Sequence, residues 1–324
     1  MTAAVDLPTA TLDTARTDPS GPTQRKSDHH QLSSGFTIQA FLRAIRPHQW
    51  VKNVLVIGAP AAAGTLLAGP TLLRLGLDFA ALCAAASATY LVNDIGDIER
   101  DRRHPTKRFR PIASGALSIA AARRGAAILA VAGLAIGAAI SVSTGATIAL
   151  YLVLTIAYSR RLKHVAWVEL GVVALGFVLR VVAGAAATST ALSLPFLTVV
   201  AAGSLFLVAG KRLSELIELG DAASDHRPVL GGYRHSDLER TLVAATTVML
   251  IAYSLWAIRA DLGGDGVPWL AASIIPVVAA TAHVGRLILG GRGGDPTALV
   301  LHDRLLQAAG LAAGLVVFAG LYVA

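Results

Sequence analysis

Long runs of apolar residues are the feature that most limits what this chain can fold into. One such run extends from Ala126 to Leu154 and contains no charged residue. A helix of roughly 20 apolar residues crosses the hydrocarbon core of a bilayer, which is about 30 Å thick. Only 15% of the 324 residues are charged and 54% are hydrophobic, whereas about 25% of the residues in a soluble protein are charged. The chain is therefore predicted to be an all-α integral membrane protein.

The apolar runs predict a bundle of nine transmembrane helices. Their approximate ranges are 51–69, 78–93, 119–142, 146–158, 165–187, 194–210, 238–258, 267–289 and 298–324. Frequent Gly and Ala residues let such helices approach closely, and they also permit a homo-oligomer. We assign residues 36–324 to this transmembrane domain. Residues 1–35 are polar, lack apolar periodicity and are predicted to be a disordered tail rather than a signal peptide.

Basic residues are distributed unequally between the two faces of the predicted bundle. The N-terminal segment and the loops after the even-numbered spans share one face and hold nearly all of them, whereas the other face holds only Arg74 and Arg259. By the positive-inside rule, the N-terminus is cytoplasmic and the C-terminus lies on the opposite side. Because the net charge of +8 resides in short loops, it indicates membrane lipids and phosphorylated substrates as partners, and no nucleic acid.

An acidic segment follows the second predicted span. Asp94, Asp97 and Asp101 are spaced at i, i+3 and i+7, so we expect them on one helical face. A divalent cation would relieve their mutual repulsion, and carboxylate and amide oxygens suit Mg²⁺. We therefore predict Asp94, Asp97 and Asp101 as catalytic residues and, with Asn93, as metal ligands. The alternative is a solvated cytoplasmic loop of mixed charge, but the basic residues that follow in residues 107–110 favour a site for phosphates.

The segments 93–101 and 104–115 together resemble the first signature of the UbiA-type intramembrane prenyltransferase superfamily. The resemblance extends over the chain from about Phe36. Segments 46–53, 158–163 and 210–216 are similar to those of the decaprenyl-phosphate phosphoribosyltransferase branch, which acts in arabinan and arabinogalactan precursor synthesis for the cell wall. The resemblance implies a cytoplasm-facing active site in a bacterial plasma membrane.

The same resemblance implies the substrates and the metal. The donor would be 5-phosphoribosyl 1-diphosphate, the acceptor decaprenyl (polyprenyl) phosphate, and the cofactor Mg²⁺, which would neutralise the leaving diphosphate. The sequence offers more cationic side chains than one diphosphate requires, as expected for two phosphorylated substrates. The family pattern adds Lys52 and Tyr158 as residues that bind phosphate. The residues expected to bind substrate phosphates are Lys52, Lys107, Arg108, Arg110, Tyr158, Lys163, Lys211 and Arg212.

Two further groups of charged residues are candidates for the site. Glu218, Asp221 and Asp225 repeat the i, i+3, i+7 spacing and form either a second acidic site or a solvated loop helix. Within the fifth predicted span, Glu169 is expected to line the cavity. Arg180 is expected to make a structural contact, with residues 303 and 304 as candidate partners.

Two other functions remain open at this point. A UbiA-type aromatic prenyltransferase would use a prenyl diphosphate and fewer basic residues. A small-solute transporter would show internal repeats and charges near the middle of the membrane, whereas the acidic residues here follow the ends of spans.

Overall fold

The computed structural model describes residues 38–223, 227–261 and 267–323, so the predicted tail over residues 1–35 lies outside the described part of the chain. Across these ranges the regular structure is helical, with no β-strand. This outcome confirms the predicted all-α class. Helices are expected in a membrane because each helix satisfies its own backbone hydrogen bonds in lipid.

Eight helical segments in the described residues are long and apolar enough to cross a membrane. They are α3 (Thr71–Gly96), α5 (Ile119–Ile140), α6 (Val142–Arg160), α7 (Val168–Thr188), α8 (Leu194–Leu219), α10 (His235–Asp261), α11 (Trp269–Ala272) with α12 (Ile274–Leu289), and α14 (Arg304–Tyr322). Many of their large apolar side chains face outwards, as expected where lipid replaces water. The eight segments correspond to eight of the nine predicted spans.

The first predicted span, over residues 51–69, is not one long helix. The 3₁₀ helix η1 (Pro47–Ile57) is followed by the short α2 (Gly58–Ala62) and then by turns. Pro60 has no backbone N–H to continue a helix, and Gly64 has a φ of 68°, which glycine adopts without strain. The segment still packs into the bundle through Val56, which is buried in a core cluster with residues of α3, α6 and α7.

Polar side chains at the helix starts explain several boundaries. Ser118, Ser141 and Ser193 accept hydrogen bonds from backbone N–H groups in the first turns of α5, α6 and α8, which is the usual role of serine at a helix N-terminus. Asp303 does the same for α14. It thereby divides the last predicted span into α13 (Pro296–His302) and α14.

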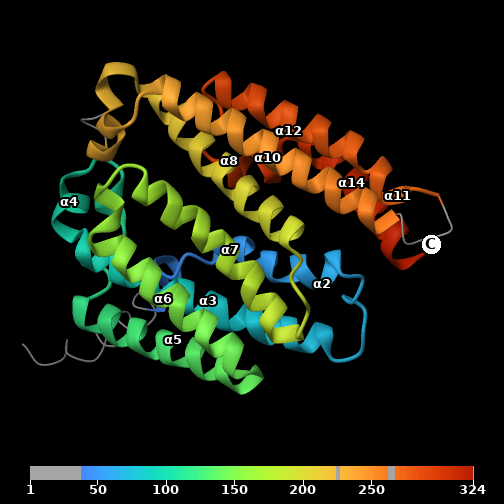
Figure 1. Ribbon diagram of the computed structural model, residues 1–324. Helices are drawn as coiled ribbons and strands as arrows, with labels where there is room; N and C mark the ends of the chain where they lie inside the picture. Colours follow the sequence, from blue (N-terminus) through green and yellow to red (C-terminus); the bar gives the residue numbers. More distant parts are fainter. Residues whose placement is uncertain (1–37, 224–226, 262–266, 324) are drawn as a thin grey trace, which may run out of the picture.

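The helices form two groups that are consecutive in sequence (Figure 1). In one group α3, α5, α6 and α7 enclose an apolar core together with η1. In the other, α8, α10, α12 and α14 pack together, and α7 and α8 join the two groups. Figure 1 shows the short helix α4 (Ile98–Arg103) at one end of the bundle. The opposite end carries α2 and the end of α14, where Tyr322 accepts a hydrogen bond from the Leu66 N–H at 3.2 Å.

Short helices connect the long ones at the end that carries α4. They are η2 (Lys107–Phe109), η3 (Leu162–His164), η4 (Gly220–Ala222) and η5 (Pro228–Gly232). These connections bring most of the predicted site residues to the same end of the molecule.

Candidate functional site

The acidic segment does not lie on one continuous helix, contrary to the expectation of a single helical face. Helix α3 ends at Gly96, Asp97 occupies the junction with φ −100° and ψ 5°, and α4 begins at Ile98. The chain therefore turns between Asp94 and Asp101. Asp94 and Asp101 are both buried, whereas Asp97, between them in the sequence, is partly exposed.

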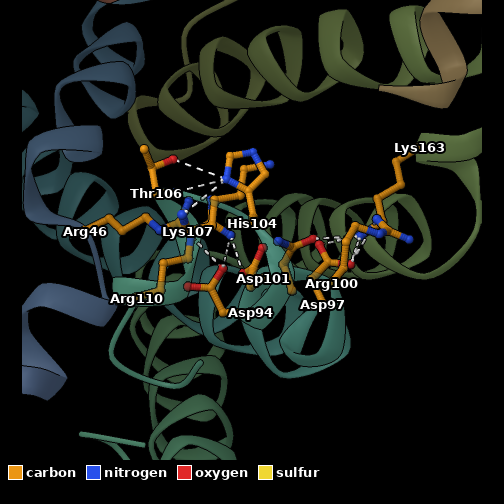
Figure 2. A network of polar contacts seen from close by, with 11 residues as sticks. Arg46, Asp94, Asp97, Arg100, Asp101, His104, Thr106, Lys107, Arg110 and Lys163 are labelled. Atoms are coloured by element: carbon orange, nitrogen blue, oxygen red, sulfur yellow. Dashed lines mark hydrogen bonds and ion pairs between the residues drawn. The ribbon is translucent and has the colours of Figure 1, made fainter. Parts of the chain in front are cut away.

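Asp94 and Asp101 are bridged by one guanidinium group. Arg110 Nη1 lies 3.2 Å from Asp94 Oδ1 and 2.7 Å from Asp101 Oδ2. Arg46 donates a second charged hydrogen bond to Asp94 Oδ1, at 2.5 Å, and these residues converge in Figure 2. The backbone of Arg46 has a φ of 54°, a strained conformation for a non-glycine residue that is frequently found at functional sites.

Asp97 and Asn93 are joined by Lys163, which follows α6 in η3. Lys163 Nζ lies 2.7 and 2.8 Å from the two carboxylate oxygens of Asp97. It also donates to Asn93 Oδ1 at 3.3 Å. Arg100 adds a weaker contact to Asp97 at 3.5 Å, and both partners of Asp97 are visible in Figure 2. The site thus neutralises each of its three aspartates with nearby cations.

The carboxylates are chemically suited to Mg²⁺, although the described residues contain no cluster of three or more His, Cys, Asp or Glu side chains arranged for a metal. Protein Mg²⁺ sites often use only one or two carboxylates and take their other ligands from water and substrate phosphates. Oxygens of Asp94 and Asp101 already converge on one cationic nitrogen of Arg110. The Arg110 guanidinium group occupies the region between the two carboxylates.

The loop after α4 carries three more of the predicted phosphate ligands. Lys107 is half-buried, and both its burial and the neighbouring Arg110 lower the pKa of its ammonium group. Its backbone N–H and that of Thr106 point to the His104 ring, which fixes the turn, as Figure 2 shows. Arg108 is exposed and stacks on Phe109, with 4.8 Å between its guanidinium carbon and the ring centroid. Lys107 and Arg110 therefore face the acidic residues more closely than Arg108 does.

A cavity of about 240 Å³, here called the inner cavity, lies between η1, α3, α6 and α7. Its lining combines cations with aromatic and apolar side chains. The lining residues are Arg46, Lys52, Thr89, Tyr90, Asn93, Tyr151, Thr155, Tyr158, Ser159, Val172, Val173, Gly176, Phe177 and Arg180. Two of the predicted phosphate ligands, Lys52 and Tyr158, are therefore part of one cavity wall.

Arg180 contributes to the inner cavity, and the suggested contact with residue 303 or 304 is wrong. Its guanidinium group donates to Asn53 Oδ1 at 2.8 Å, to the Gly176 carbonyl at 2.7 Å and to the Tyr151 hydroxyl at 2.9 Å. Asp303 instead contacts His283 at 3.0 Å. Neutral acceptors hold Arg180 in place, so its positive charge remains available to an anion in the cavity.

Glu169 is fully buried and is absent from the lining of the inner cavity, where it was expected. Arg212 Nε donates to Glu169 Oε1 at 2.5 Å, and Arg212 Nη2 donates to Oε2 at 3.2 Å. The hydroxyls of Tyr158 and Tyr233 donate to the same carboxylate at 3.3 and 3.1 Å. Arg212 would thus have to leave a buried ion pair before it could bind a substrate phosphate.

The predicted second acidic site is not built on one helix. Helix α8 ends at Leu219, and Gly220 with a φ of 51° starts the turn into η4. Glu218 is exposed at this helix end. The structure describes no side chain for Asp221, and Asp225 lies outside the described residues. Lys211, about two turns before Glu218 on α8, approaches Glu215 at 4.0 Å.

Sequence reasoning did not assign a site role to two arginines that the structure brings to the charged residues. Arg46 contacts Asp94, and Arg227 lies 3.5 Å from Glu169 and 3.9 Å from Glu215. Arg46 was identified only as part of a motif and of the basic face. The contacts of both arginines join segments that are far apart in the sequence, and residue spacing does not reveal such contacts.

Comparisons with known protein families and with individual proteins point to the same family. A model of the UbiA prenyltransferase family matches residues 56–287. The chain is 39% identical to the decaprenyl-phosphate phosphoribosyltransferase of Mycobacterium tuberculosis over 282 residues, which cover 85% of this chain and 92% of the relative. It is 38% identical to the protein of that name from Corynebacterium glutamicum over 277 residues, or 84% of this chain and 83% of the relative.

The fold is also similar to that of a solved structure. A UbiA homolog from Archaeoglobus fulgidus bound to DMAPP and Mg²⁺ aligns with a TM-score of 0.64 at 17% sequence identity. The alignment covers 87% of this chain and 97% of the homolog.

Proposed function

This chain belongs to the UbiA prenyltransferase family, and from that premise we propose that it is a membrane phosphoribosyltransferase. It transfers the 5-phosphoribosyl group from 5-phosphoribosyl 1-diphosphate to decaprenyl phosphate. The products are decaprenylphosphoryl-5-phosphoribose and diphosphate. The observation that carries this proposal is the 38–39% identity, over most of both chains, to relatives named decaprenyl-phosphate phosphoribosyltransferase.

The inner cavity supports a phosphorylated lipid as the acceptor. Arg46, Lys52 and Arg180 come from three separate segments and line the same cavity. Its remaining walls include aromatic and aliphatic side chains such as Phe177 and Val173. Cations beside apolar walls fit an anionic headgroup attached to a hydrocarbon chain.

The acidic residues at the end of α3 support a metal-assisted departure of diphosphate. Asp94 and Asp101 would hold Mg²⁺, with Asn93 and Asp97 beside them, and the bound metal would supply neutralising charge for the leaving group. Arg110 and Lys107 would meet phosphate oxygens of the donor. Arginine can bind two of these oxygens at once, whereas lysine acts as a point charge.

The reaction then needs little proton transfer. The bond between ribose C1 and the diphosphate oxygen breaks, and the diphosphate leaves with the bonding electrons. An oxygen of the acceptor phosphate forms the new bond to C1, which has oxocarbenium character during the exchange. Because the second pKa of a phosphate monoester is about 6, the acceptor is already an anionic nucleophile at neutral pH. The residues therefore act by binding and orienting two anions.

We further propose that the end bearing α4 faces the cytoplasm and that the C-terminus lies on the other side of the bacterial plasma membrane. Arg100, Arg160 and Lys163 lie at the α4 end, and the positive-inside rule favours the cytoplasm for such residues. A soluble phosphorylated donor would reach the acidic residues from that side.

An assay with purified protein tests the reaction. Donor labelled in the ribose is supplied with decaprenyl phosphate and Mg²⁺, and we expect a labelled lipid together with one diphosphate per transfer. A parallel reaction receives a prenyl diphosphate and an aromatic acceptor, and a third follows solute flux into sealed vesicles. Prenylation of the aromatic ring without phosphoribosyl transfer, or flux without diphosphate release, would contradict the proposal.

A further inference from the structure

A second cavity, here called the outer cavity, has a volume of about 500 Å³ and lies near the α4 side of the bundle, where α3 and α6 end and α5 begins. Its cationic lining comes from Arg100, Arg123, Arg160 and Lys163, and its apolar lining from Val92 and Ile95. We propose that the outer cavity binds the phosphate headgroup of an anionic phospholipid. This proposal concerns lipid binding and does not depend on the transferase reaction.

The charge balance of the outer cavity favours an anion. Asp97 is the acidic residue in the lining, and it is already paired with Lys163 at 2.7 Å and with Arg100 at 3.5 Å. Among the residues that the structure describes, Arg123 and Arg160 have no hydrogen-bond or ion-pair partner, and both are exposed. Two free guanidinium groups thus face one cavity from different helices, α5 and α6. Guanidinium groups bind phosphate oxygens through paired hydrogen bonds.

The position along the spans favours a lipid over a freely soluble anion. Asp97 directly follows α3, Arg160 is the last residue of α6, and Arg123 lies in the second turn of α5. These are the levels at which spanning helices emerge into the headgroup region. Val92 and Ile95 lie towards the membrane interior on α3. When Arg123 and Arg160 hold the phosphate of a phospholipid, its acyl chains can therefore pack against these apolar side chains. Basic residues at this level attract anionic lipids.

The outer and inner cavities are separate but adjacent. Asp97 lines the outer cavity and Asn93 the inner one, while Ser159 lines both. Lys163 donates hydrogen bonds to both Asn93 and Asp97 and thus connects the two linings. Arg123 and Arg160 line only the outer cavity, so their substitution separates lipid binding from the proposed substrate contacts.

Native mass spectrometry of the delipidated full-length protein tests the proposal. Phosphatidylglycerol is titrated into the unaltered protein, into the double variant Arg123→Gln/Arg160→Gln, and into a matched control, Arg124→Gln/Arg161→Gln. The control alters the neighbouring exposed arginines on the same segments, which do not line the outer cavity, and it removes the same total charge. We expect the first variant to bind phosphatidylglycerol at least about 100-fold more weakly, because each guanidinium group would lose a charge-assisted contact with the phosphate, which is worth about one decade or more. The control should bind like the unaltered protein.

Two further measurements identify the source of the bound phosphate. Phosphatidylcholine, which is zwitterionic, should bind all three proteins weakly and equally. Binding of 5-phosphoribosyl 1-diphosphate with Mg²⁺, measured by calorimetry in phosphatidylcholine nanodiscs, should be the same for all three. An equal loss of phosphatidylglycerol binding in the two double variants would contradict a specific site in the outer cavity. Loss of donor binding in Arg123→Gln/Arg160→Gln with phosphatidylglycerol binding retained would make the outer cavity a donor site and overturn the proposal.

Discussion

Arg212 and Glu169 form an ion pair inside the bundle, with Arg212 Nε 2.5 Å from Glu169 Oε1 and with side chains that are 5% and 0% exposed. The pair joins α8 to α7, and hence one group of helices to the other. Glu169 also accepts hydrogen bonds from Tyr158 and Tyr233. Since a charge buried without its partner is costly, we interpret this carboxylate as a fixed anchor that positions Tyr158 in the wall of the inner cavity.

Replacement of Glu169 by Gln should therefore destabilise the protein strongly. The change leaves the guanidinium of Arg212 buried without its principal counter-charge, which costs about 3–5 kcal/mol. Thermal unfolding of the detergent-solubilised protein measures the effect. Glu215→Gln is the control, because Glu215 also contacts Arg212, at 2.7 Å, but is 20% exposed, so its loss should cost less. Unchanged stability of Glu169→Gln would show that Arg212 does not need this partner and is free to bind phosphate.

The acidic residues at the end of α3 should be required for turnover and for its dependence on Mg²⁺. Asp94→Asn and Asp101→Asn should each lower the rate of phosphoribosyl transfer by orders of magnitude, because they remove charge that would hold the metal. Removal of divalent metal by a chelator should stop the unaltered enzyme, and added Mg²⁺ should restore it. Transfer rates with and without metal check both statements.

Glu99→Gln provides the matched control for this prediction. Glu99 belongs to the same acidic segment, but its side chain is 69% exposed and it pairs with Arg102 rather than with the buried aspartates. We expect a nearly normal rate for Glu99→Gln. If Asp94→Asn and Glu99→Gln were equally active, the acidic segment would be a solvated loop and the site would lie elsewhere.

Much of the fold follows from the sequence because lipid imposes strict requirements on a chain. An apolar run of about 20 residues has few structures other than a spanning helix, and eight of the predicted spans correspond to helices. The exception, residues 51–69, contains Pro60, which cannot donate a backbone hydrogen bond to the preceding turn, and Gly64, which follows α2 with a positive φ. Neither residue changes the apolar character of the segment. Composition alone therefore predicted a span where the structure has two short helices.

The candidate site was only partly predictable, because spacing describes neighbours along one helix and not contacts between helices. The segment with Asp94 and Asp101 was identified, but the turn at Asp97 between them was not. Arg46 lies 48 residues before its partner Asp94, and Arg180 lies 127 residues after its partner Asn53. Such pairs depend on how the spans pack in three dimensions, which no periodicity within a single span encodes.

Asp78 should lower the stability of the protein, and its replacement by Asn should raise it. Its side chain in α3 is fully buried, and both carboxylate oxygens lack a hydrogen-bond partner among the described residues. An unsatisfied buried polar group typically costs about 1–3 kcal/mol, and a charged one costs more. Asn preserves the shape and removes the ionisable group, so the midpoint of thermal unfolding should rise while the transfer rate stays the same. Asp237→Asn, the same change at a more exposed position, should alter stability little.

A lower unfolding midpoint for Asp78→Asn would contradict this expectation. It would mean that the carboxylate makes a favourable interaction that the asparagine amide cannot replace. A loss of transfer without a change in stability would instead give Asp78 a direct role in activity.

Gly184 should be required for the close packing of α7 against η1. A Cβ atom at Gly184 would overlap the backbone carbonyl of Val56, and backbone atoms cannot move aside as the end of a flexible side chain can. Gly184→Ala should therefore push η1 away from α7. Because η1 also carries Lys52 and Asn53, the change should both lower the unfolding midpoint and weaken substrate binding in the inner cavity. The two measurements are thermal unfolding and the Michaelis constant for decaprenyl phosphate.

Gly171→Ala, on the same helix, separates this packing effect from the intrinsic effect of alanine. A Cβ atom at Gly171 meets no other atom within 4 Å in the described structure. Alanine is favoured over glycine in a helix by about 0.8–1.0 kcal/mol, so Gly171→Ala should raise the unfolding midpoint slightly and leave the Michaelis constant unchanged. Opposite signs for the two substitutions would establish that the contact with Val56 outweighs helix propensity at Gly184. If both variants were stabilised alike, η1 would be able to shift without cost, and its position could not be what holds Lys52 in the cavity wall.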